Sequence, residues 1–91
     1  MKKAVALRPS SPSPWREADV AALQALYRGD ATPFQQKHAL EYIINTVAAT
    51  YDLSYRADSP RDTDFAEGKR FVGLQIVKLL KLNLLALKET P

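Results

Sequence analysis

The stretch Asp64–Leu87, DFAEGKRFVGLQIVKLLKLNLLAL, is the longest apolar periodic run of the chain and decides its fold class. Asp64, followed three residues later by Glu67, has the spacing of a capping box, which predicts that a helix begins here. Lysines gather toward the other end, where a helix carries a negative partial charge. Leucine, lysine and alanine, all good helix formers, dominate the second half. The stretch therefore predicts one long helix.

The apolar side chains of this helix cover about half of its circumference, more than one neighbouring helix can bury. We expect a second copy of the chain or another partner to cover the surplus. At 100° per residue, the residues of the expected oligomer interface share one side: Val72, Ile76, Leu79 and Asn83. The polar member of this set would either fix the register of a helix bundle or lie in solvent where the helix frays.

Four basic residues fall within about 80° of one another on another side of the same helix. They are Arg70, Lys78, Lys81 and Lys88. We expect this basic stripe to be a candidate contact for duplex DNA or for an acidic partner. Because polar residues interrupt the apolar run, we do not expect the helix to span a membrane.

The composition limits the domain count, the kinds of metal site and the partners that the chain can have. Ninety-one residues make one domain with a modest core, and the absence of cysteine excludes disulfides and thiolate metal sites. The net charge is +3, with basic residues gathered at both ends. Such a chain is compatible with nucleic acid, with an acidic surface or with neither. Nothing in it resembles a signal peptide, so we expect a cytoplasmic protein or one that is assembled in the cytoplasm.

The first residues predict an arm followed by a helix. Residues 1–14 contain RPSSPSP, which favours extended backbone, so we expect a flexible N-terminal arm and a single helical domain over 15–91. The first helix should run from about Pro14 or Trp15 to Arg28, since proline suits the first turn. We expect the tryptophan to anchor the core.

The second helix has the clearest start signal. Thr32, Pro33 and Gln35 supply a cap, a proline in the first turn and the partner residue of a capping box. An amphipathic stripe follows, and two residues face away from it. His38 is expected at the surface without a metal, and Tyr42 is a candidate partner contact.

A polar connector, residues 52–63, leads to the long helix and contains a second candidate partner contact, Tyr55. The sequence thus predicts an all-α chain: a three-helix bundle with a long C-terminal helix and an extended N-terminal arm. No phosphate-binding loop, histidine-rich pattern or nucleophile with a neighbouring base is visible. We therefore expect a protein that is not an enzyme and uses no cofactor or metal.

Two stretches resemble a known group in their pattern. They are WREADVAALQALYRGDATPFQQKHALEYIINTVAATYDLSYR and DTDFAEGKRFVGLQIVKLLKL. Their most characteristic pieces are Asp19–Val20, Gly29–Gln36 and Phe65–Leu80. Together they resemble small helical proteins of tailed bacteriophages and prophages. The resemblance implies no catalytic residue. It implies a role near the head and packaging machinery, in the virion or in DNA packaging.

Three functions follow as hypotheses. The first is a phage-type interaction protein that self-associates through the long helix and acts in head assembly or DNA packaging. The second is an inhibitor that binds a host protein or a defence complex. The third is a small DNA-binding domain, since the first two helices are joined by a short turn, loosely like a helix-turn-helix. Only Lys37 is basic at the start of the second helix, which is poor for reading bases.

Overall fold

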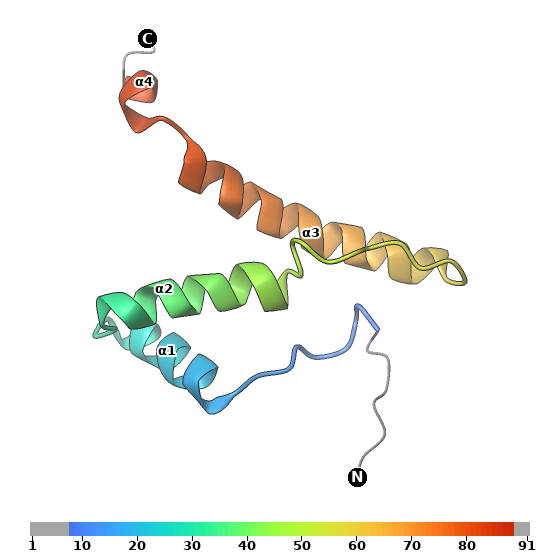
Figure 1. Cartoon of the computed structure of the whole chain (residues 1–91), viewed down its shortest axis with the longest axis horizontal. Coiled ribbons are helices and arrows are strands. Elements are labelled where there is room, and N and C mark those ends of the chain that lie inside the picture. The colour runs from blue at the N-terminus through green and yellow to red at the C-terminus, as the bar shows by residue number, and fades with distance from the viewer. Residues whose placement is uncertain (1–7, 89–91) are drawn as a thin grey trace.

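A computed structural model describes residues 8–88, and every regular element in that range is helical (Figure 1). The prediction of an all-α chain is confirmed. The elements are α1 (Glu17–Arg28), α2 (Pro33–Tyr42), the short π-helix η1 (Ile43–Val47), α3 (Pro60–Lys81) and α4 (Leu84–Lys88). Residues 1–7 of the expected arm lie outside the described residues.

The turn between α1 and α2 forms as its residues predict. Gly29 ends α1 with a φ of 83°, the left-handed region that favours glycine. Thr32 begins α2 with both hydrogen bonds of the capping box to Gln35. The start of α1 was predicted too early, because the helix begins at Glu17. Trp15 precedes it and is 68% exposed, so the prediction of a core anchor was wrong.

A buried carboxylate joins the two helices of this hairpin. Asp19 accepts hydrogen bonds from the backbone N–H of Arg16, at 2.9 Å, and from Nε2 of His38 on α2, at 2.7 Å. These two bonds, the backbone one first, lower the pKa of the Asp19 carboxyl. The histidine is therefore half-buried and contributes to helix pairing, rather than lying at the surface as predicted.

A sharp turn at the end of η1 redirects the chain. Ala49 has a φ of 49°, which is unusual for a residue with a side chain. Thr50 is fully buried, and its backbone N–H and its hydroxyl both donate to the carbonyl oxygen of Ile44, at 3.1 and 2.7 Å. The turn thus satisfies its polar groups internally and presents a compact surface to α3.

The middle of α3 crosses this turn at Gly73. A Cβ added to Gly73 would overlap Thr50 Oγ1 and would lie 2.9 Å from Thr50 Cβ and 3.0 Å from Ala48 Cβ. The absence of a side chain at position 73 therefore permits the close approach of α3 to this turn. Gly68 is exposed and has no atom within 4 Å of an added Cβ, so nothing within the chain explains that glycine.

The long helix begins and ends at other residues than predicted. It begins four residues earlier than Asp64, because the hydroxyl of Ser59 accepts the N–H of Asp62 and Pro60 fits the first turn. It ends at Lys81, where Leu82 becomes extended. Asn83 then accepts the N–H of Ala86 at the start of α4, in the manner of a helix cap.

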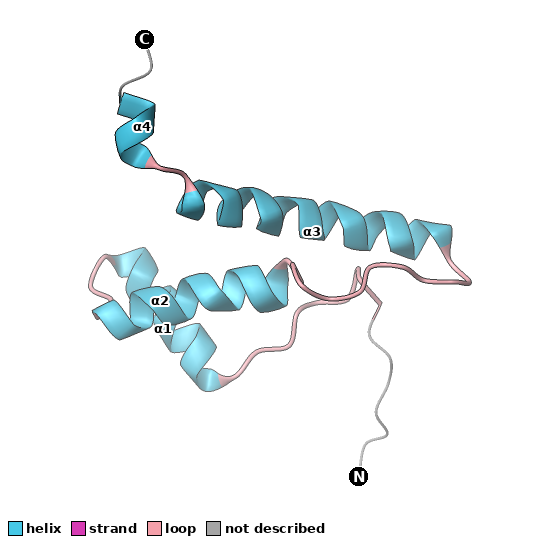
Figure 2. Cartoon of the chain, turned by 45° about the horizontal axis from the view of Figure 1, so that its top comes forward, coloured by secondary structure: helices cyan, strands magenta, loops and turns pink. Residues whose placement is uncertain are grey.

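The predicted three-helix bundle is not confirmed within one chain. α1 packs on α2, whereas α3 contacts η1 and neither α1 nor α2 within residues 8–88 (Figure 2). The molecule is consequently flat and elongated, with a Cα radius of gyration of 16.4 Å and extents of 51 × 33 × 16 Å. A compact chain of this length would have a radius of gyration of about 12 Å.

The described part of the N-terminal arm lies against the body. The guanidinium of Arg8 donates to both carboxylate oxygens of Asp62, at 3.0 and 3.3 Å. Lys69 Nζ donates to the carbonyl of Pro9, and the hydroxyl of Tyr42 donates to the carbonyl of Pro14. Residues 8–14 thus join α2 to the first half of α3. None of the helices between residues 8 and 88 has the length and apolarity needed to cross a bilayer.

We predict that Gly73→Ala lowers the free energy of unfolding by about 1–3 kcal/mol, because the added methyl group would force α3 away from Thr50. The matched control, Gly68→Ala, should raise it by about 1 kcal/mol, because alanine is the better helix former at an open position. Denaturant titrations of both variants at equal protein concentration measure the difference. Equal effects of the two substitutions would contradict the close approach at Gly73.

We predict a loss of stability in acid that involves Asp19. Its pKa in the folded chain lies below the usual value of 3.8, so its stabilising contribution is complete above that value. The contribution disappears as the pH falls through the lower, folded-state pKa, where the carboxylate becomes protonated. Thermal unfolding between pH 6 and 2 should show a shallower acid dependence for Asp19→Asn than for the unmodified chain.

Asp58→Asn is the control for this measurement, because Asp58 is an exposed connector residue without a hydrogen bond or ion pair to the rest of residues 8–88. It should leave the acid dependence unchanged. An acid profile of Asp19→Asn that matches the unmodified chain would refute the assignment.

Candidate self-association surface

The side chains that the chain buries are mostly small, although its sequence is rich in leucine. Within residues 8–88, five of the six buried hydrophobic residues are alanines, and Thr50 is the largest side chain that is fully buried. The core residues come from α1, α2, η1 with the turn after it, and α3: Ala22, Ala25, Ala39, Ile44, Ala48 and Ala66. Burial of alanine removes little apolar surface from water, so this core gives modest hydrophobic stabilisation.

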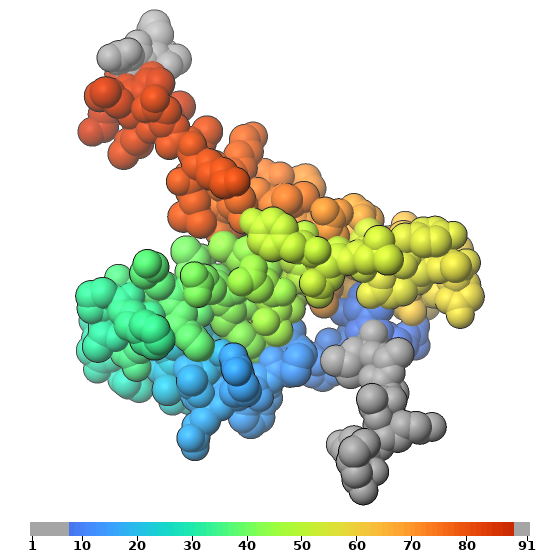
Figure 3. All heavy atoms as spheres, viewed as in Figure 1, coloured from blue at the N-terminus to red at the C-terminus, as the bar shows by residue number. Residues whose placement is uncertain are grey.

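The large apolar side chains lie instead on the surface of α3 and α4. Those exposed from the first turns of α3 onward are Phe65, Phe71, Val72, Leu74, Leu79, Leu80, Leu82, Leu84, Leu85 and Leu87. The second half of α3 and α4 extend away from the hairpin, which is visible in the space-filling view (Figure 3). A soluble monomer seldom exposes a contiguous apolar surface of this size, and such surfaces mark contact sites.

The total exposed area supports the same conclusion. The chain exposes 7477 Å², whereas a compact monomer of 10.2 kDa exposes about 5300 Å². The excess of about 2000 Å² on one chain is larger than the roughly 800 Å² that each partner buries in a standard two-protein interface. A second chain could therefore cover the surplus.

The four residues of the predicted oligomer interface do not share one element. Val72 and Leu79 are 56% and 67% exposed on α3, so both are available to a partner. Ile76 is half-buried within the chain. Asn83 follows the end of α3 and caps α4, which removes it from the predicted face.

The predicted basic stripe is also divided. Lys78 and Lys81 are exposed near the end of α3, but Lys88 lies on α4. Arg70 points into the chain, where its Nε donates to the carbonyl of Thr50, at 3.0 Å, and its NH1 pairs with Glu67, at 3.1 Å. The prediction of a single basic stripe is therefore wrong. Of its four residues, Lys78 and Lys81 remain exposed on α3.

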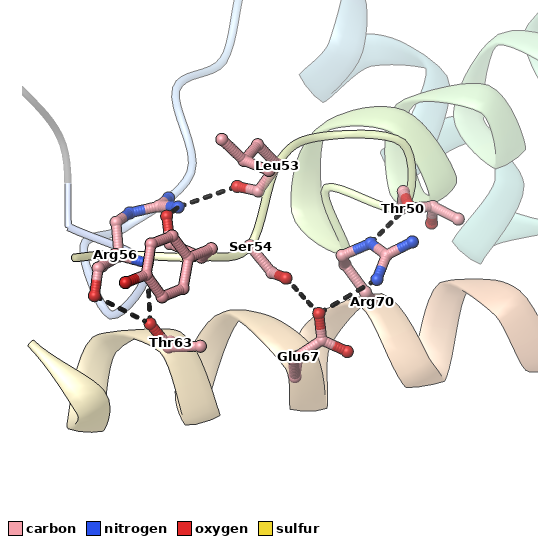
Figure 4. Close-up of polar contacts among 8 residues, drawn as sticks. Thr50, Leu53, Ser54, Arg56, Thr63, Glu67 and Arg70 are labelled. Atoms are coloured by element: carbon pink, nitrogen blue, oxygen red, sulfur yellow. Dashed lines mark hydrogen bonds and ion pairs between the residues drawn. The ribbon is translucent and has the colours of Figure 1, made fainter.

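A polar seam holds the connector along the first half of α3 (Figure 4). The hydroxyl of Thr63 accepts the N–H of Arg56 and donates to its carbonyl oxygen. Ser54 donates to the carboxylate of Glu67, and this bond, followed by the attraction of Arg70, lowers the pKa of Glu67. The connector is consequently an ordered strap whose contacts fix the position of α3.

The two predicted tyrosine contacts have different surroundings. Tyr42 is half-buried and donates its hydroxyl to the carbonyl of Pro14, at 2.8 Å, so its polar atom is used within the chain. Tyr55 is 63% exposed on the connector and remains available to a partner.

A cationic cleft of about 250 Å³ was not predicted from the sequence. The arm, the end of η1, the connector and α3 surround it, and four bases line it with one acid, Asp52. Arg8 is paired with Asp62 and Arg70 with Glu67, whereas Arg56 and Lys69 have only backbone carbonyl partners. The bases come from three separate segments, the arm, the connector and α3, so no local sequence pattern indicates the cleft. The cleft could hold a small anion.

No group of three or more potential ligands is arranged to hold a metal ion within residues 8–88. Comparison of the chain with protein-family models, with curated proteins and with solved structures found no match. The function must therefore be argued from the surface and the packing described above.

We predict that Arg70→Ala releases the strap without abolishing the helices. The substitution removes the donor to the Thr50 carbonyl, just before the connector, and the partner of Glu67, whose carboxylate accepts from Ser54 in the connector. Limited proteolysis should then cut the segment 51–58 faster than in the unmodified chain, while circular dichroism remains helical. Lys78→Ala, which removes an exposed base of the same helix, is the control and should leave the cleavage rate unchanged.

Proposed function

We propose that this chain is a non-catalytic helical interaction protein of bacteriophage type that associates with a second copy of itself through α3. The observation that supports it best is the inverted distribution of apolar side chains: alanines are buried, while the aromatic and leucine side chains of α3 and α4 are exposed. A second copy of α3 would cover these side chains. In that assembly, helices from two chains would form the bundle that one chain leaves incomplete.

The phage assignment rests on the resemblance of residues 15–82 to small phage and prophage proteins. With it, we propose a role accessory to virion assembly or DNA packaging, in the host cytoplasm or within the particle. A small self-associating helical protein without a visible catalytic centre suits such a role. Co-purification of the chain with assembled heads is the expected biological result.

Two alternative functions are separated by simple measurements. An inhibitor of a host protein or defence complex would use the same apolar surface, and would bind one host protein in a fixed ratio. A small DNA-binding domain is favoured by one specific observation, the cleft in which Arg56 and Lys69 lack carboxylate partners. Binding to duplex DNA would weaken steeply as salt rises, because phosphate contacts release counterions.

We predict that Phe71→Asp lowers the solution mass of the assembly to that of one chain. Phe71 is 62% exposed on α3, so a charge there should interrupt the contact between copies without entering the folded chain. Light scattering across a range of protein concentrations measures the mass, and circular dichroism confirms the helical content. Leu53→Asp, which places the same charge on an exposed leucine of the connector, is the control and should leave the mass unchanged.

An unmodified chain that stays monomeric at all concentrations would refute self-association. If that monomer shifts in mass only with duplex DNA at low salt, the DNA-binding alternative replaces the proposal. If it forms a stoichiometric complex with one host protein, the inhibitor alternative replaces it.

A further inference from the structure

One exposed stripe of α3 has a symmetric order of charges. Its members repeat at intervals of three and four residues, the spacing of side chains that meet in paired helices. In chain order they are Asp64, Glu67, Phe71, Leu74, Lys78 and Lys81. They lie within about 100° of one another on the helix, and all six are exposed. The stripe therefore reads acid, acid, apolar, apolar, base, base.

This order is its own complement when the helix is reversed. Asp64 and Lys81 are equally far from the midpoint between Val72 and Gly73, and so are Glu67 and Lys78. A second α3 laid antiparallel on the first would place each acid opposite a base. A parallel copy would instead place like charges against each other, which is unfavourable.

We propose that two copies of this chain pair through antiparallel α3 helices, related by a two-fold axis that passes between Val72 and Gly73. Phe71 of each copy then packs on Leu74 of the other at the centre, with the two charge pairs on either side. Such a contact is isologous, because both copies use the same surface. The inference rests on the proposed function and adds its geometry.

The central and basic parts of the stripe are open to a second helix, whereas the strap runs beside its acidic end and binds Glu67. Phe71 and Leu74 are 62% and 41% exposed, and the contact with η1 uses Gly73 on the opposite side of the helix. Lys78 and Lys81 have no hydrogen bond or ion pair within residues 8–88. Glu67 is bound by Ser54 and Arg70, yet half of its side chain remains exposed.

The test reverses charges at one end, then at both. Lys78→Glu with Lys81→Glu makes the stripe entirely acidic, so it should raise the dimer Kd at least about tenfold, measured by analytical ultracentrifugation. Asp64→Lys with Glu67→Lys makes it entirely basic and should weaken pairing similarly. The fourfold variant with all these changes restores every antiparallel charge pair and should return the Kd to within about threefold of the unmodified chain.

Lys37→Glu with Lys88→Glu is the control, because it changes the net charge equally at two exposed lysines outside the stripe and should leave the Kd unchanged. A fourfold variant that stays as weak as the double variants would overturn the antiparallel arrangement. A dimer that none of these substitutions weakens would also overturn it while leaving self-association intact. An unmodified chain without any dimer would refute the proposed function itself.

A distance measurement provides an independent check. The chain has no cysteine, so Arg61→Cys introduces a single labelling position on an exposed part of α3 outside the stripe. Spin labels at this position should be about 35 Å apart in the antiparallel pair, because the two residues lie on opposite sides of the midpoint. A separation near 10 Å would show parallel helices and overturn the proposal.

Discussion

The contact between Thr50 and Gly73 determines how the two parts of the molecule are joined. α3 reaches the turn after η1 only because position 73 carries no side chain where the threonine is fully buried. The hydroxyl of Thr50 is satisfied by the Ile44 carbonyl, and its own carbonyl accepts from Arg70, so a polar residue can occupy this crossing. The strap, the arm and the cleft all take their positions from the line of α3 that this crossing fixes.

The same crossing explains why so much apolar surface stays exposed. α3 has 22 residues. The turn after η1 holds it near its middle and the strap holds its first half, so its last turns project beyond the hairpin. The leucines there have no neighbour from their own chain. A small alanine core holds the hairpin together, and a long helix presents larger side chains to the surface.

The sequence predicted the helices better than their packing. Caps are local chemistry, so the start of α2 with Thr32 and Gln35 was predicted correctly. The capping-box spacing of Asp64 and Glu67 indicated too late a start for α3, which Ser59 and Pro60 begin. The surroundings of Tyr42 and Arg70 could not be predicted, because each donates to a backbone carbonyl of a distant segment, and no residue pattern marks such an acceptor.

The connection between α1 and α2 also has a consequence for the order of folding. These helices pair across a turn of a few residues, so the hairpin can close quickly after little loss of chain entropy. α3 meets its contacts across the longer strap, so more chain entropy is lost before they form. Helix pairing in the hairpin should therefore precede the docking of α3. Under the proposed self-association, only the burial of the exposed leucines should become faster as the chains become more concentrated.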